Sequence, residues 1–199
     1  MSKVLASLML IVAMLGLGGC GYNTMQAGDQ QIKAAWAEVV NQYQRRADLV
    51  PNLVETVRDY AAHEKDTLTA VTEARAKVAQ MQVPADILTN PEAFKTFQQN
   101  QAQLTQTLSR LLAVSESYPD LKANQNFLSL QSQLEGTENR ITVARRDYIE
   151  AVRQYNTELR TIPGRWIAAI LYPDAVVKEN FTAEPGAMTV PKVDFGKGS

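Results

Sequence analysis

The chain has little of the chemistry on which most enzymes and metalloproteins depend. Among 199 residues there is one cysteine, Cys20, and one histidine, His63. A disulfide within the chain is therefore excluded, and so is a metal site built from paired cysteines. No glycine-rich phosphate loop and no serine-nucleophile motif occurs in the sequence. We accordingly expect no catalytic residues, no cofactor and no metal.

An excess of charge of one sign is also lacking. Lys and Arg together number 20, and Asp and Glu together number 21. Proteins that bind nucleic acid carry a basic patch or stripe, because they must neutralise phosphates. The nearly balanced charge therefore argues against nucleic acid as a partner.

Long apolar runs are scarce, with one exception near the N-terminus. Residues 4–17 are almost wholly apolar, Lys3 precedes them, and Gly18 and Gly19 lead into Cys20. A helix that spans a membrane needs about 20 apolar residues, whereas the core of a signal peptide needs about 7–15. The pattern predicts a bacterial lipoprotein, with residues 1–19 as its signal peptide and Cys20 as the lipidated first residue. The alternatives are an uncleaved anchor and a buried core helix.

Lipidation at Cys20 would fix where the protein works. Two acyl chains already hold a protein firmly at a membrane, so the membrane is the expected partner at this end. We expect the mature chain to face the periplasm. Gly21, rather than Asp, follows the cysteine, which favours the outer membrane if the host has two. The sequence leaves open whether the chain forms a homo-oligomer.

Strong helix formers dominate residues 26–161, and alternating β-type stretches are essentially absent. A seven-residue repeat of apolar side chains runs from Phe127 to Ile162 and predicts a long helix over 122–161. The fold class is therefore predicted as all-α. We expect an elongated antiparallel bundle of about four long helices over 20–172.

Boundaries of the other helices follow from caps and prolines. We expect one helix over 26–49 that continues past Pro51 with a kink, rather than two separate helices, and an apolar seam that runs on to Val78. Asn90 followed by Pro91 predicts the start of the next helix. Gly136 is a weak point in the last long helix that would allow a neighbour to approach closely.

The end of the chain changes character after Ile162. Residues 165–171 predict a short apolar helix, and an irregular tail over 173–199 follows it. This short helix contains Trp166 and would close the open end of the bundle. The alternative is that it lies on a lipid surface, although Arg165 is its only charge.

Four charged residues fall on or beside the predicted apolar seams. Glu64 takes the heptad position of Val57 and Val71, and Glu138, Arg145 and Arg75 lie beside other seam positions. Buried carboxylates need partners, and arginine can pair with them through two hydrogen bonds. We therefore predict a possible buried polar network made of these residues: Glu64, Arg75, Glu138 and Arg145. It would set the register of the helices; a pocket for a ligand or partner is the alternative, and catalysis is the least favoured.

His63 is expected to be a solvated surface residue. On a helix, Asp59 and Asp66 would share its face, which would be the basis of a metal site if there were one.

Several spaced segments resemble the LemA family of bacterial helical envelope proteins. They are Gly21-Tyr22-Asn23, Trp36, Arg45 to Val54, Tyr60 to Glu64, Ala74-Arg75, Tyr118 to Asn124, Leu134 to Ile141, Ala144 to Tyr148, and Tyr155-Asn156. Two features depart from the family pattern: Ile149 stands where asparagine is usual, and many members begin with an uncleaved transmembrane helix.

The resemblance implies a helical bundle on the outer side of the membrane, with no established catalytic residues. Family members are often encoded beside membrane metalloproteases or TPM-domain proteins, which implies a role in envelope maintenance. We expect a non-enzymatic, lipid-anchored scaffold or adaptor whose partners are unknown envelope proteins. The alternatives are an accessory regulator of an envelope protease or stress response, and a ligand-binding helical bundle.

Overall fold

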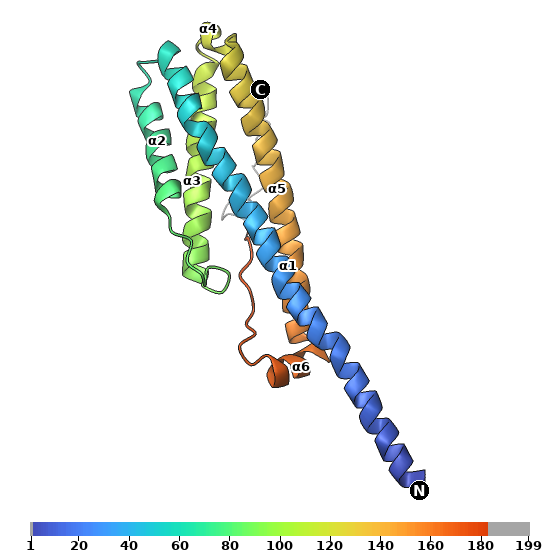
Figure 1. Ribbon diagram of the computed structural model, residues 1–199. Helices are drawn as coiled ribbons and strands as arrows, with labels where there is room; N and C mark the ends of the chain where they lie inside the picture. The colour runs from blue at the N-terminus through green and yellow to red at the C-terminus, as the bar shows by residue number, and fades with distance from the viewer. Residues whose placement is uncertain (1, 183–199) are drawn as a thin grey trace, which may run out of the picture.

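A computed structural model describes the backbone of residues 2–182 and the side chains of residues 23–182 (Figure 1). This part of the chain holds six helices and no strand, which confirms the all-α prediction. The helices are α1 Ser2–Tyr60, α2 Lys65–Gln80, α3 Pro91–Ser115, α4 Pro119–Lys122, α5 Gln125–Arg160 and α6 Gly164–Leu171. Where side chains are described, no helix is both long and apolar enough to cross a membrane.

The bundle consists of two antiparallel pairs of helices. Helices α1 and α5 lie side by side along most of the bundle, and α2 packs on α3 to form the other pair (Figure 1). The short α4 closes the end where α3 passes into α5, and α6 lies at the opposite end against α1 and α5.

The prediction that one helical seam runs without interruption from Leu53 to Val78 is wrong. Helix α1 passes through Pro51 without a break, as expected, but it ends at Tyr60, and α2 begins at Lys65. The seam that was expected to run straight from Leu53 to Val78 is folded back on itself.

Burial explains this turn. Val57 and Ala61 before the turn pack in one buried cluster with Leu68 and Val71 after it, so folding back lets the two halves of the stripe bury each other. The N–H of Glu64 donates to the carbonyl of Ala61 at 3.0 Å and closes the turn. The turn contains no glycine or proline, and the local sequence therefore predicts a continuous helix.

Side-chain caps fix the starts of α3 and α5. The Asn90 Oδ1 atom accepts a hydrogen bond from the N–H of Ala93 at 3.1 Å, and Pro91 takes the first helical position, as predicted. Asn124 caps α5 in the same way, accepting from the N–H of Phe127 at 3.0 Å. The last long helix consequently begins at Gln125 rather than at residue 122.

Two apolar clusters make up the core. The one nearer α4 is mainly aliphatic and contains Leu104, Leu111 and Leu121. The other, nearer α6, is an aromatic cluster in which Trp36 lies at its centre, with its ring centroid 5.0 Å from that of Phe97 and 5.4 Å from that of Tyr148. Rings of this size bury much apolar area and fill the wide gap between the helix pairs.

Close backbone approach occurs at Gly28 rather than at Gly136. A Cβ atom at Gly28 would lie 3.1 Å from the Tyr155 Cδ2 atom, so this glycine lets α5 pack tightly on α1. A Cβ atom at Gly136 would meet nothing within 4 Å, and the expected close neighbour is absent there. At Gly164 a Cβ atom would lie only 2.3 Å from the carbonyl oxygen of Glu158, which restricts the turn between α5 and α6 to glycine.

These environments predict opposite effects of the same substitution. Gly136→Ala should raise the free energy of unfolding by about 0.5–1 kcal/mol, because alanine restricts the unfolded chain and favours the helix. Gly164→Ala should lower it by about 1–3 kcal/mol, because the backbone must move to relieve overpacking. Urea denaturation followed by circular dichroism measures both. If both substitutions changed the free energy of unfolding in the same direction, the environments described for the two glycines would be contradicted.

Candidate functional site: a groove around Arg46

Arg46 is the one buried charged side chain among the described residues, at 1% exposed. It projects from the C-terminal half of α1. One terminal nitrogen donates to Thr105 Oγ1 at 2.7 Å and to Glu138 Oε1 at 2.8 Å. The other donates to the side chain of Gln101 at 2.6 Å and to its carbonyl at 3.2 Å. A single guanidinium group therefore ties α1 to α3 and to α5.

These bonds offset most of the cost of burying the cation. An unpaired buried guanidinium would cost several kcal/mol, and Glu138 supplies the opposite charge while remaining 39% exposed. The guanidinium carbon also lies 5.0 Å from the ring centroid of Tyr43. One donor is left over, because the buried Nε of Arg46 has no hydrogen-bond partner. Gln42 Oε1 is likewise buried without a partner.

A groove of about 920 Å³ surrounds this arginine and is lined by α1, α3, α5 and the chain after α6. Its charged and aromatic lining includes Arg46, Glu138, Arg145 and Phe181. The Arg145 guanidinium carbon lies 4.4 Å from the ring centroid of Phe181. Burial raises the pKa of Tyr43, although the nearby cations of Arg145 and Arg46 oppose that effect. The groove thus combines both signs of charge with polar amides and aromatic surface.

Residues 179–182 form one wall of the groove, and the chain just before them is bound to α5. The Asn156 side chain donates to the carbonyl of Lys178 and accepts from its N–H, both at 2.9 Å. The Tyr148 hydroxyl donates to the carbonyl of Glu179 at 2.7 Å, and burial raises the pKa of Tyr148. Phe181 then enters the aromatic cluster. The described part of the irregular tail therefore lies along the bundle; residues 183–199 lie outside the described residues.

The structure does not join the four residues of the predicted polar network. Glu138 and Arg145 line the groove, whereas Glu64 lies in the turn before α2, where it accepts a hydrogen bond from the Tyr118 hydroxyl at 3.1 Å. The Nε of Arg75 donates to the carbonyl of Ala47 at 3.3 Å. The heptad argument for Glu64 assumed a helix that continued through it, and the chain turns there instead.

Arg46 is the residue that sequence reasoning missed. A signal was present, because Val39, Arg46 and Leu53 are spaced by seven and share one buried stripe of α1. A charged residue at such a position indicates either that it has a partner across the bundle or that the wrong face of the helix has been assigned as buried.

Other predicted sites are placed as follows. His63 lies exposed in the turn between α1 and α2, so the helix face expected to pair it with Asp59 and Asp66 does not exist. Within the described side chains, no group of three or more His, Cys, Asp or Glu residues is placed to hold a metal ion. The backbone of Cys20 belongs to α1, and its side chain lies outside the described residues.

The buried pair predicts a rescue experiment. Glu138→Met should cost about 2–3 kcal/mol, because it leaves the Arg46 cation without an opposite charge. Adding Arg46→Met should make the double variant more stable than Glu138→Met alone, since the uncompensated charge is gone. Chemical denaturation of the single and double variants measures this. Losses that simply add would show that the pair is not coupled.

The fold and the groove define an all-α bundle protein whose helix pairs are held by one buried arginine. A sequence model of the LemA family matches residues 35–195. The chain belongs to the LemA family, as the spaced motifs predict.

Curated relatives agree with this assignment. Magnetosome proteins MamQ 1 and MamQ 2 of Paramagnetospirillum magneticum are each 26% identical to it, over 82% of this chain and 66% of their own length. Protein LemA of Metamycoplasma hominis is 23% identical over 70% of this chain and 59% of its own length. The chain thus spans about two thirds or less of each of these relatives.

Proposed function

We propose that this LemA-family protein is a lipid-anchored, non-enzymatic adaptor of the bacterial cell envelope that receives a partner protein in the Arg46 groove. The observation that carries the proposal is the continuity of α1. The helix runs from Ser2 to Tyr60 and includes both Cys20 and Arg46. Met25, only five residues after Cys20, is already buried in the bundle at 2% exposed. An anchor at Cys20 would therefore hold the bundle without a flexible linker.

With an anchor at Cys20, this continuity would set an upper limit on the distance between the groove and the membrane. Residues 20 and 46 are 26 positions apart on one helix, which corresponds to about 39 Å at 1.5 Å per residue. An adaptor benefits from such a stiff spacer, because its partner then meets the groove within this distance of the lipid. The lining combines charged, polar and apolar side chains, which suits a segment of another envelope protein.

Groove chemistry favours binding over catalysis as its role. Arg46 is fully buried and hydrogen-bonded to three side chains. Its role is therefore to join α1 to α3 and α5, which line the groove. Glu138 and Arg145 stand nearer to solvent and are available to pair with charges on a partner. If the partner is an envelope protease, accessory control of that protease would be one form of the same adaptor role.

Cys20→Ser tests the anchor. In cells labelled with an alkyne fatty acid, we expect the unmodified chain to carry the label and Cys20→Ser to lose it and accumulate as the unprocessed precursor. The lipid anchor would be contradicted by a mature protein that is not cleaved after residue 19. It would also be contradicted by label that persists in Cys20→Ser.

Photo-crosslinking tests the adaptor role. A photoreactive residue at Gln98, which lines the groove, should give discrete protein adducts in cells. The same residue at Glu73, exposed on α2 and outside the groove lining, is the matched control and should give few. Adding Arg145→Glu, which leaves the Arg46–Glu138 pair in place, should weaken the Gln98 adducts. Equal adducts at both positions, or none at Gln98, would contradict a partner in the groove.

A small-molecule ligand is the second candidate. The unpartnered Nε of Arg46, which lines the groove, favours it, because buried polar atoms normally have partners. Native mass spectrometry of the purified chain should then show a retained mass that Arg46→Met removes, with no protein adducts at Gln98.

A further inference from the structure

An apolar patch is exposed on the outer side of α6 and just before it. The α6 patch consists of four side chains with exposed fractions of 50–77%: Ile162, Trp166, Ile170 and Leu171. The opposite side of the helix is packed, because Gly164 and Ala168 are buried where α6 meets α1 and α5. Within the helix, Trp166 and Ile170 are spaced by four, so they lie on one face. The end of the bundle is thus closed by one side of α6, and the other side is left open.

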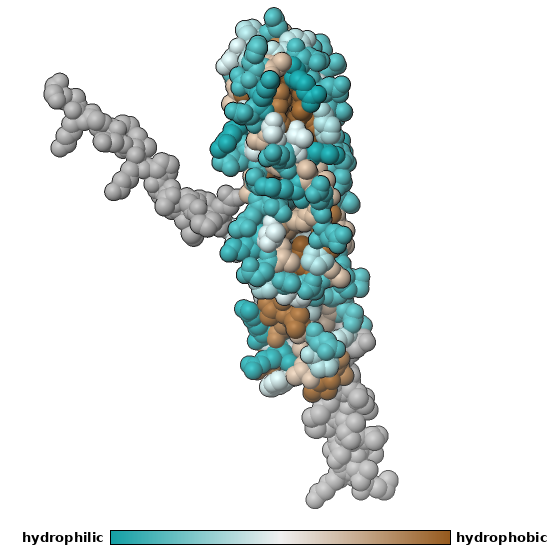
Figure 2. Space-filling model, turned by 90° about the vertical axis from the view of Figure 1, so that its left-hand side faces the viewer, coloured by the Kyte–Doolittle hydropathy of each residue, from teal (hydrophilic) through white to brown (hydrophobic). Residues whose placement is uncertain are grey.

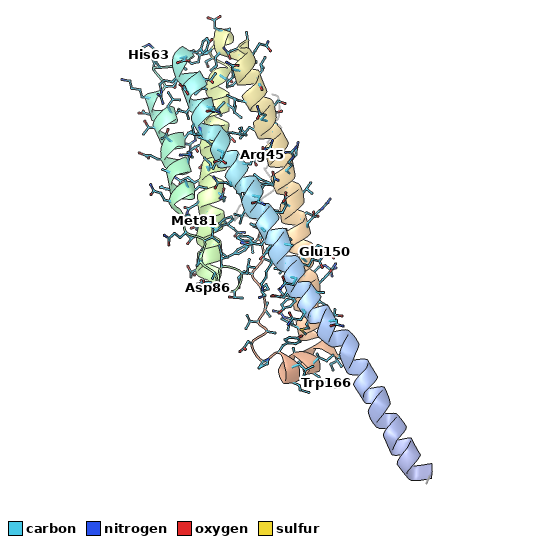
Figure 3. All side chains as sticks on the ribbon, viewed as in Figure 1. Arg45, His63, Met81, Asp86, Glu150 and Trp166 are labelled. Carbon is cyan, nitrogen blue, oxygen red and sulfur yellow. The ribbon has the colours of Figure 1, made fainter. Side chains whose placement is uncertain are left out.

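The α6 patch lies beside the N-terminal approach to the bundle. Leu171 and Met25 line the same small cavity of about 260 Å³ between α6 and α1. Met25 follows Cys20 by five residues of helix, an axial distance of about 7.5 Å. Figure 3 places Trp166 at this end of the molecule, far from His63 at the other end. Hydrophobic surface gathers at the same end in the space-filling view (Figure 2).

We propose that the α6 patch rests on the surface of the membrane that anchors the chain, so that the bundle touches lipid at two places. The proposal relies on the membrane attachment at the N-terminus in the proposed function, but not on the adaptor role. Tryptophan and aliphatic side chains suit the boundary between headgroups and acyl chains. Arg160 and Arg165 are exposed beside the patch, where they can approach anionic headgroups.

Size and position favour lipid over a second copy of the chain. A stable protein interface engages about 20–30 residues on each side, whereas the α6 patch offers four. Leu171 shares a cavity with Met25, and Met25 follows Cys20 by about 7.5 Å of helix, so an anchored bundle holds the patch near the bilayer. A second contact would also restrict tilting of the bundle and keep the groove at its height.

The two tryptophans of the chain provide the test, because only one belongs to the patch. Trp166 is 61% exposed, and Trp36 is 8% exposed in the aromatic cluster. The full-length lipidated chain is reconstituted in vesicles of phosphatidylethanolamine and phosphatidylglycerol, with and without brominated acyl chains that quench tryptophan on contact. Trp36→Phe then reports Trp166 alone, and Trp166→Phe reports Trp36 alone.

We expect brominated lipid to remove most of the fluorescence of Trp36→Phe and to leave that of Trp166→Phe nearly unchanged. If Trp36→Phe fails to fold, the difference between the unmodified chain and Trp166→Phe gives the same information. A photoreactive residue at Ile170 should form adducts with lipid. Adducts there with a second copy of the chain or with another protein would overturn the proposal.

Co-sedimentation with the vesicles separates this proposal from the proposed function. Protein that sediments with vesicles while Trp166 stays unquenched would overturn the α6 contact and leave the anchor intact. Protein that does not sediment would overturn both. Quenched Trp166 together with a groove that captures no protein would support the α6 contact and remove the adaptor role.

Discussion

Most of the other helices pack against α1, and the arrangement of the bundle depends on α1 being one continuous helix. Helix α5 packs along it, α2 folds back on its second half, and α6 closes against its first half. Trp36 and Arg46 project from it toward α3. Because a helix is stiff, an anchor at its N-terminus limits how far the groove lies from the lipid, and a second contact at α6 would set the orientation of the bundle.

Arg46 gives this arrangement its specificity at a cost in stability. Apolar residues of similar volume in place of a buried ion pair are often neutral or stabilising, so the bundle does not need a cation in order to fold. The guanidinium group instead fixes where α3 and α5 stand relative to α1, since its acceptors belong to both. The wide spacing that results is filled by aromatic rings toward α6 and is left open as the groove beside Arg46. Structure and proposed function thus depend on the same side chain.

Much of this architecture could be predicted from the sequence. The seven-residue repeat predicts α5, and Asn90 with Pro91 predicts the start of α3, because both signals are local. The turn at 61–64 could not be predicted, since it arises from burial between α1 and α2 and no breaker residue marks it. Arg46 was detectable as a charge on an apolar stripe. The two hydrogen bonds between the Asn156 side chain and the backbone of Lys178 were not detectable in the sequence. They join segments 22 positions apart, and they use backbone atoms that every residue has.

The central claim is that the anchor and the bundle are joined by one rigid helix. Hydrogen exchange of backbone amides over residues 23–31, in the lipidated chain on vesicles, tests it most directly. The account predicts that these amides are protected to an extent comparable with those of residues 39–46 in the same helix. Exchange at the rate of an unstructured chain between Cys20 and Ile32 would contradict it, because the bundle would then hang from a flexible tether.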